Sequence, residues 1–266
     1  MRHVASLVVL LTAVTLVGCV DPPVAAAPAS GATASPEIVA TAADSAARPS
    51  DTRPLLLYVF KDRSWSANST ATPAVTMDDL NALVAAVANH GGEIGVGEVC
   101  ARSFVNLTRL RIDESPTRPI PPAATGNPYL QREALAPYQR ALGEYHAAVA
   151  ARDAVIAADT ERFIAAAWPR ISAPNTCGAS DVAGAVERGL LALGEPATAW
   201  SRPPRKALGL ISDIQHNVGK WTVVIPDDVE VHAINGIGSK GPMANLPTLR
   251  LWEGLAGFIR DLRLSN

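Results

Sequence analysis

Leu55-Leu56-Leu57-Tyr58-Val59-Phe60 is an unbroken apolar run, and it decides the fold class of this 266-residue chain. Such a run is typical of a strand that is covered on both faces, as in a parallel sheet. Thr76, with Asp79 three residues later, forms a capping pattern that predicts the start of a helix. The apolar face from Leu80 to Val87 continues that helix, and the pair Gly91-Gly92 ends it. A strand followed by a helix is therefore expected.

The same two patterns alternate along the rest of the chain. Further strands are expected at 93–100, 105–112, 206–211 and 229–234, and further helices at 128–168, 181–193 and 249–262. Alternating strands and helices favour a doubly wound, mostly parallel α/β sheet with helices on both faces. The strand at 105–112 is expected to lie antiparallel at an edge.

The helix expected at about 128–168 is a long insertion in this pattern. Its apolar residues recur at seven-residue intervals, at Leu135, Leu142, Val149, Ile156 and Phe163. One amphipathic helix lying on the domain explains this spacing, and a coiled-coil arm explains it as well. Because proline interrupts a helix, Pro137 predicts that the regular part begins near it.

The N-terminus has the pattern of an export signal. Arg2 precedes an apolar run from Val4 to Val17, which is too short to span a membrane as a stable helix. The run ends in Gly18-Cys19 and resembles the lipobox of bacterial lipoproteins. That resemblance implies removal of residues 1–18, a lipid on Cys19, and a position in the cell envelope outside the cytoplasm, facing the periplasm or the cell surface. An ordinary signal peptide with an incidental cysteine is the alternative.

Composition divides the remainder into a linker and one domain. Residues 19–53 consist largely of Ala, Pro, Ser, Thr and Asp, which bury too little apolar surface to offset the entropy of ordering. Residues 54–266 have the length of one large domain. The net charge of -2 provides no basic surface for nucleic acid. In an oxidising compartment Cys100 and Cys177 are expected to pair, although spacing alone does not show that they lie close enough.

Polar side chains follow two of the expected strands and precede one helix. Asp62, Ser64 and Ser66 come after the first strand, Ser212-Asp213 after the strand at 206–211, and Ser180 before the helix at 181. Ligands of such sheets bind at the carboxyl ends of the strands. Carboxylate and hydroxyl oxygens are hard ligands, and they suit Mg²⁺ or Mn²⁺.

These residues resemble the von Willebrand factor A (vWA) family and its metal-ion-dependent adhesion site (MIDAS). The resemblance covers most of 54–266 and implies that Asp62, Ser64, Ser66, Ser180 and Asp213 hold the ion, directly or through water. It also implies that a partner protein supplies an acidic residue to the metal. The family usually has a threonine where Ser180 stands, and Thr176 is a competitor for that position. Lys61 and the long helix depart from the family pattern.

The sequence leaves other functions open. The polar residues also fit turns and helix caps without a metal. The resemblance implies a non-enzymatic adhesion or assembly lipoprotein, and a structural lipoprotein acting through the inserted helix is the alternative. An exported hydrolase using His216 is a further alternative, although no Gly-x-Ser-x-Gly motif is present. Asp62→Ala is expected to remove affinity for Mg²⁺ or Mn²⁺ with little loss of folding, because it leaves the apolar strand before it intact.

Overall fold

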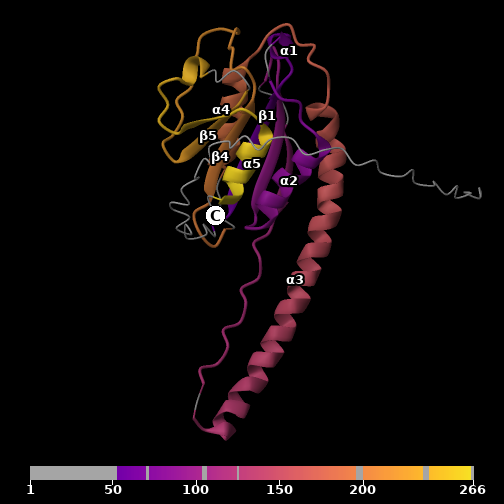
Figure 1. The fold of residues 1–266 in the computed structure, drawn as a ribbon, viewed down its shortest axis with the longest axis vertical. Coiled ribbons are helices and arrows are strands. Elements are labelled where there is room, and N and C mark those ends of the chain that lie inside the picture. Colours follow the sequence, from indigo (N-terminus) through magenta and orange to yellow (C-terminus); the bar gives the residue numbers. More distant parts are fainter. Residues whose placement is uncertain are drawn as a thin grey trace, which may run out of the picture. The chain divides into compact units, whose positions relative to one another are not determined.

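The computed structural model describes residues 53–69, 72–103, 107–124, 126–195, 200–235 and 240–264 (Figure 1). These residues belong almost entirely to the domain expected at 54–266. The predictions for the signal peptide at 1–18, for Cys19 and for nearly all of the linker lie outside the described residues.

The described residues form a six-stranded sheet with the order β3-β2-β1-β4-β5-β6. The strands are β1 (Leu55–Asp62), β2 (Gly92–Val99), β3 (Thr108–Ile112), β4 (Arg205–Ile211), β5 (Val229–Ile234) and β6 (Leu249–Trp252). The edge strand β3 pairs antiparallel with β2, and the other neighbouring pairs are parallel. The predicted α/β class and the antiparallel edge strand are confirmed.

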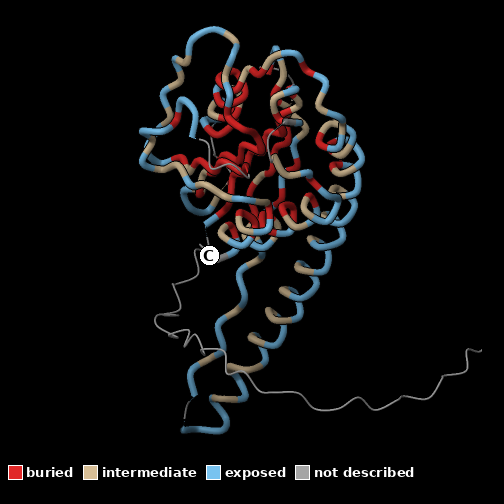
Figure 2. Tube along the Cα trace, turned by 45° about the horizontal axis from the view of Figure 1, so that its top comes forward, coloured by how far each residue is buried: buried red, intermediate tan, exposed pale blue. Residues whose placement is uncertain are grey.

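Helices cover both faces of the sheet, which explains why all eight residues of β1 are buried. Alternate side chains of β1 enter two separate cores. Leu55, Leu57 and Val59 pack with α2 (Met77–Ala88), α5 (Leu255–Leu264) and the end of α3 (Pro128–Ile171). Leu56, Tyr58 and Phe60 pack with α4 (Val182–Gly194) and with loops that follow β4 and β5. Figure 2 shows the buried residues concentrated around the sheet.

Two glycines in β2 make room for aromatic rings from its neighbour. A Cβ atom on Gly95 would lie 2.3 Å from the Tyr58 ring, and one on Gly97 would lie 2.6 Å from the Phe60 ring. The rings of β1 therefore lie across β2, on the face of the sheet that α4 covers. The small residues of β2 are required by packing rather than by a turn.

The last part of the chain corrects one prediction. A single helix was expected at 249–262, but β6 occupies Leu249–Trp252 and α5 begins only at Leu255. Leu249 pairs with Val231 of β5, so the open edge of the sheet recruits the first residues. The periodicity of a short apolar run does not distinguish a strand from a helix, and tertiary pairing decides between them.

The long helix α3 is present and exceeds the predicted length. It spans Pro128–Ile171 and is capped by the side chain of Asn127, which accepts a bond from the amide of Tyr129. Pro137 lies within the helix, so the prediction that the regular part begins near it is wrong. A proline removes one hydrogen bond from a helix, and the many other bonds of a 44-residue helix can carry that loss.

The two ends of α3 differ in burial, and the explanation as one helix lying on the domain describes its C-terminal part. Phe163, Ala167 and Ile171 are buried in the core beside the sheet, whereas no residue from Pro128 to Ala150 is buried (Figure 2). The C-terminal part thus lies on the domain and the N-terminal part extends beyond it. No helix in the described part of the chain has the length and apolar character needed to cross a bilayer.

Candidate functional site

The predicted site lies where two central strands end side by side. β1 pairs with β2 on one side and with β4 on the other, and the chain connections diverge at this point. Such a switch point leaves a crevice at the carboxyl ends of the strands, where α/β sheets bind their ligands. β1 ends at Asp62 and β4 at Ile211, so their last residues carry the polar groups to one edge of the sheet, which we call the rim.

Asp62 joins three loops of the rim. Its side chain is fully buried, and its Oδ1 accepts a hydrogen bond from the amide of Ser64 at 2.8 Å. Its Oδ2 accepts from the hydroxyl of Ser180 at 3.1 Å and from that of Ser212 at 2.6 Å. Three of the five predicted ligands therefore lie together. Ser212 is an additional member that the sequence placed beside Asp213 without giving it a role.

These bonds change the expectation for Asp62→Ala. The substitution would leave the Ser180 hydroxyl, the Ser212 hydroxyl and the Ser64 amide without their acceptor in a buried place. Each buried polar group that loses its partner costs about 1–3 kcal/mol. Asp62→Ala is therefore expected to destabilise the fold, and the more conservative Asp62→Asn is the better probe of metal binding.

The hydroxyl groups retain the lone pairs that a cation needs. Ser180 and Ser212 donate their protons to Asp62. This leaves the oxygen lone pairs of Ser180 available, whereas Ser212 uses one of its lone pairs to accept a bond from the amide of Ile214. The hydroxyls of Ser64 and Ser66 lie 2.9 Å apart and share a hydrogen bond. Ser66 opens the short helix α1 (Ser66–Ser69), so the turn after β1 directs both serines back to the rim.

Asp213 provides a carboxylate oxygen that no described protein group satisfies. Its side chain is fully buried, and its Oδ1 accepts a bond from the amide of Gln215 at 3.1 Å. Its Oδ2 is buried and has no hydrogen-bond partner among the described residues. Asp213 is thus not hydrogen-bonded to the other four predicted ligands, all of which are described. A buried carboxylate oxygen without a partner is unfavourable, and a water or an ion can supply the missing contact.

The backbone after Asp213 is held in a strained conformation. Ile214 has a φ of 58°, in the left-handed region that β-branched residues avoid. Its amide donates to the Ser212 hydroxyl at 2.9 Å, and its side chain is buried. Strain of this kind costs about 1–3 kcal/mol and is concentrated at functional sites. Here it fixes the turn that directs Asp213 and Ser212 at the rim.

The structure decides between the two candidates for the middle loop. Ser180 is buried and bonded to Asp62, whereas Thr176 is exposed. Ser180 is not the N-cap of α4, because the side chain of Asp181 takes that position and accepts a bond from the amide of Gly184 at 2.9 Å. The amide of Ser180 donates to Asn217 Oδ1 at 2.7 Å, which joins this loop to the one after β4.

A disulfide between Cys100 and Cys177 holds the middle loop against the sheet. It is the pairing expected from the sequence. Cys177 also forms two backbone bonds with the loop after β1, receiving one from the amide of Trp65 and donating one to the carbonyl of Arg63. Cys100 directly follows β2 and accepts a bond from the amide of Asp181. The disulfide thus ties three rim segments together.

Two further side chains define the surroundings of the rim. Lys61 is buried, and its ammonium donates to the carbonyl of Asp62 at 2.7 Å. Burial lowers the pKa of Lys61 below its usual 10.5, although the negative charges of Asp62 and Asp213 act in the opposite direction. Trp65, between the two serines, is 68% exposed and therefore does not serve to pack the loop.

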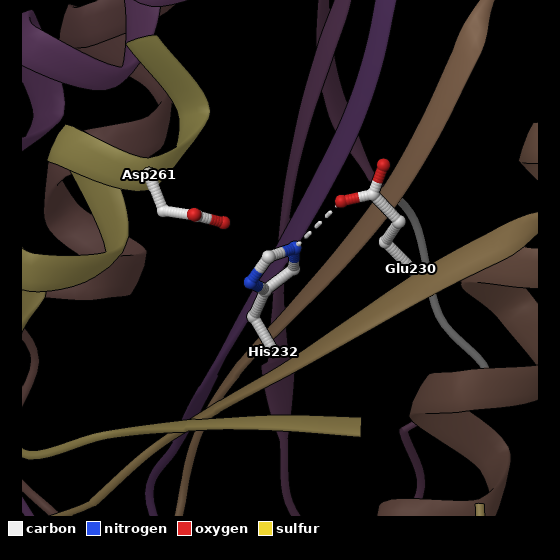
Figure 3. A group of neighbouring side chains, drawn as sticks. All are labelled: Glu230, His232 and Asp261. Atoms are coloured by element: carbon white, nitrogen blue, oxygen red, sulfur yellow. Dashed lines mark ion pairs between the residues drawn. The ribbon is translucent and has the colours of Figure 1, made fainter. Parts of the chain in front are cut away.

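A second group of ionisable residues, which the sequence analysis missed, lies under α5. Glu230, His232 and Asp261 face one another, with Glu230 and His232 on the same side of β5 (Figure 3). The sequence signal for this group was Glu230 and His232 two residues apart in an expected strand, because such residues point to the same face. Metal binding would need a lone pair on a ring nitrogen of His232 and carboxylates that are not already paired.

The hydrogen bonds of this group do not suit a metal. The indole N–H of Trp252 donates to Nδ1 of His232 at 3.0 Å, so the neutral ring carries its proton on Nε2, 3.6 Å from Glu230. Arg205 makes two bonds of 2.7 Å to Glu230, and Arg250 pairs with Asp261. The carboxylates are neutralised and Nε2 has no lone pair, so we interpret the group as an internal ion-pair network.

The hydrolase alternative gains no support at His216. Its Nδ1 accepts a long bond from the amide of Ala183 at 3.5 Å, and its Nε2 has no partner among the described residues. Neither nitrogen is therefore bonded to a described serine, as nucleophilic catalysis by a serine would require. The ring contacts Trp221 edge to face instead.

Comparison of the chain with known proteins gave no match to a protein-family model, to a curated protein sequence or to a solved structure.

Proposed function

We propose that this protein is a cell-envelope lipoprotein that binds a partner protein through a divalent cation held at the rim. Asp62, Ser64, Ser66, Ser180 and Asp213 would hold Mg²⁺ or Mn²⁺, directly or through water. The cation supplies an electrophilic centre that accepts an oxygen ligand from an acidic residue of the partner. The arrangement resembles the metal-dependent adhesion site of the vWA family, and the proposed role is adhesion or assembly without catalysis.

The observation that carries this proposal is the buried, unpartnered Oδ2 of Asp213, which directly follows Ser212, whose hydroxyl donates to Asp62. A hard cation would satisfy this oxygen and use the lone pairs of the serines at the same time. The network around Asp62 supports this role, because its hydrogen bonds hold the hydroxyls in place before any ion arrives. The buried ammonium of Lys61 reduces the repulsion between the carboxylates in the metal-free protein, and it also opposes the binding of a cation.

The test is calorimetric titration of Mg²⁺ and Mn²⁺ into residues 54–266, comparing the wild type with Asp62→Asn and Asp213→Asn. Both variants should bind these ions much more weakly, because each loses an anionic charge. The exposed Asp227→Asn is the control, since it makes the same change far from the rim chemistry. A wild type that binds neither ion, or variants that bind as the wild type does, would exclude the metal.

The proposed location is tested separately. Mass spectrometry of the protein purified from membranes should show an N-terminal Cys19 that carries lipid. A soluble product cleaved elsewhere would exclude the lipid anchor, while leaving the metal proposal to the titration.

A second candidate is a structural or assembly lipoprotein that acts through α3 without a metal. The exposed part of α3 favours it, because a helix that extends beyond its own domain offers surface to another molecule. Loss of the biological function on deleting that part, together with normal function of Asp213→Asn, would favour this candidate over the first.

A further inference from the structure

A proline segment and the first part of α3 together form an arm. We define the arm as residues 115–124 together with residues 128–150, none of which is buried. Pro116, Pro119 and Pro122 are half-buried while the residues between them are exposed. This three-residue period is that of a polyproline II helix, which needs no hydrogen bonds of its own. Figures 1 and 2 show this segment running beside α3.

The arm leaves the domain at the edge opposite the rim. Ile112 at the end of β3 pairs with Gly92 at the start of β2, and Gly92 pairs with Leu55 at the start of β1. Arg152 of α3 bonds to the carbonyls of Asp113 and Ala88 at this same edge. The residues of α3 before Arg152 therefore extend away from the strand beginnings, while the rim lies at the strand ends.

The described chain begins at this same edge of the sheet. Leu55 begins β1, and the carbonyl of Pro54 accepts a bond from the amide of Arg205, the first residue of β4. Residues 20–53 separate the predicted lipid on Cys19 from the domain. The helical part of the arm, from Pro128 to Ala150, is about 35 Å long at about 1.5 Å per residue.

The tip of the arm has the composition of a membrane-interface contact. Tyr129 and Leu130, at the start of α3, are 73% and 50% exposed, and Ile120, farther back along the proline segment, is 88% exposed. Arg118 and Arg132 lie beside them in the sequence and are also exposed. Apolar and aromatic side chains enter the headgroup region of a bilayer, and arginines attract anionic lipids. These side chains contribute nothing to the core of the domain, so they are available for contact with a membrane surface.

We infer that the tip of the arm rests in the headgroup region of the membrane that holds the lipid anchor. The inference depends on the lipidation in the proposed function and is independent of the metal. The arm then acts as a strut, and the rim faces away from the membrane toward partners. Lipid on Cys19 restricts the distance to the bilayer, and the tip restricts the orientation of the domain.

The experiment uses the lipidated full-length protein in vesicles of phosphatidylethanolamine and phosphatidylglycerol that contain a headgroup spin label. An environment-sensitive fluorophore is attached to Glu133→Cys at the tip, where the introduced thiol is free because Cys100 and Cys177 are paired. The matched control is Ala166→Cys, an exposed position roughly 50 Å farther along the same helix. Quenching of the tip label should exceed that of the control label severalfold.

A further variant identifies the groups responsible. Ile120→Ser, Tyr129→Ser and Leu130→Ser, combined with the tip label, should abolish the difference while circular dichroism and Mg²⁺ titration stay as in the parent. Equal, weak quenching at the two positions would overturn the inference, and so would a triple variant that is quenched as the parent is. A mature protein without lipid would overturn both the inference and the anchor, whereas failure of metal binding alone would leave the inference intact.

Discussion

Asp213→Asn should make the metal-free protein more stable, because the wild type buries a charged oxygen without a partner among the described residues. Asparagine keeps the size of the side chain and an oxygen for the amide of Gln215. An unsatisfied buried group costs about 1–3 kcal/mol, and a charged one costs more than a neutral one. The charge of Lys61 attracts Asp213 and so offsets part of the extra cost of burying the carboxylate rather than a neutral amide. We therefore expect a gain of about 1–2 kcal/mol in the free energy of unfolding.

In saturating Mg²⁺ the wild type should be more stable than Asp213→Asn, the reverse of the order expected without metal. A ligand that binds only the folded state adds about 2.7 kcal/mol of stability when its concentration is about a hundred times Kd. The wild type receives this stabilisation, whereas Asp213→Asn receives little because it lacks one anionic ligand. The assay is urea-induced unfolding of residues 54–266, followed by circular dichroism in chelator and in MgCl₂.

The control for this prediction is Asp227→Asn, which removes an exposed carboxylate. It should change stability by less than about 0.5 kcal/mol in either buffer. Two results would refute the reasoning: a wild type whose stability does not depend on Mg²⁺, or an Asp213→Asn variant that is less stable than the wild type in chelator.

The rest of the domain supports three more predictions. In chemical denaturation, Phe163→Ala should lower the free energy of unfolding by about 3–5 kcal/mol, because Phe163 is buried in the core. Leu142→Ala in the arm should lower it by under about 1 kcal/mol. Similar losses for the two variants would contradict the description of α3 as a packed C-terminal part and an exposed N-terminal part. Replacing Cys100 and Cys177 by serine removes a covalent link between residues 77 positions apart, and it should lower the free energy of unfolding by about 2–4 kcal/mol. An unchanged free energy of unfolding would contradict this prediction. Burial lowers the pKa of His232 below its ordinary 6.5, so below that pH the unfolded chain binds a proton that the folded chain does not. Stability should therefore fall as the pH drops from about 6.5 to 5, and His232→Gln should lose this dependence; a wild type that is equally stable across that range would argue against it.

Local signals predicted most of the elements because they act over a few residues. The apolar run at 55–60 and the capping pattern of Thr76 with Asp79 predicted β1 and α2, and the structure contains the complete capping box. β5 has the predicted bounds of Val229–Ile234. The signals failed where a neighbour in space decided the outcome, as at β6, where the open edge of β5 recruits Leu249 as its partner.

The sequence by itself determined which chemical groups the rim contains. Asp62, Ser64, Ser66 and Asp213 had to lie at strand ends, since parallel strands carry their final residues to one edge. Only the tertiary structure decided how these groups are paired. Asp62 is already bound by the hydroxyls of Ser180 and Ser212, while Asp213 keeps an oxygen that no described residue satisfies. Hydrogen-bond partners from segments more than a hundred residues apart cannot be read from local spacing, because the folding of the sheet brings them within bonding distance.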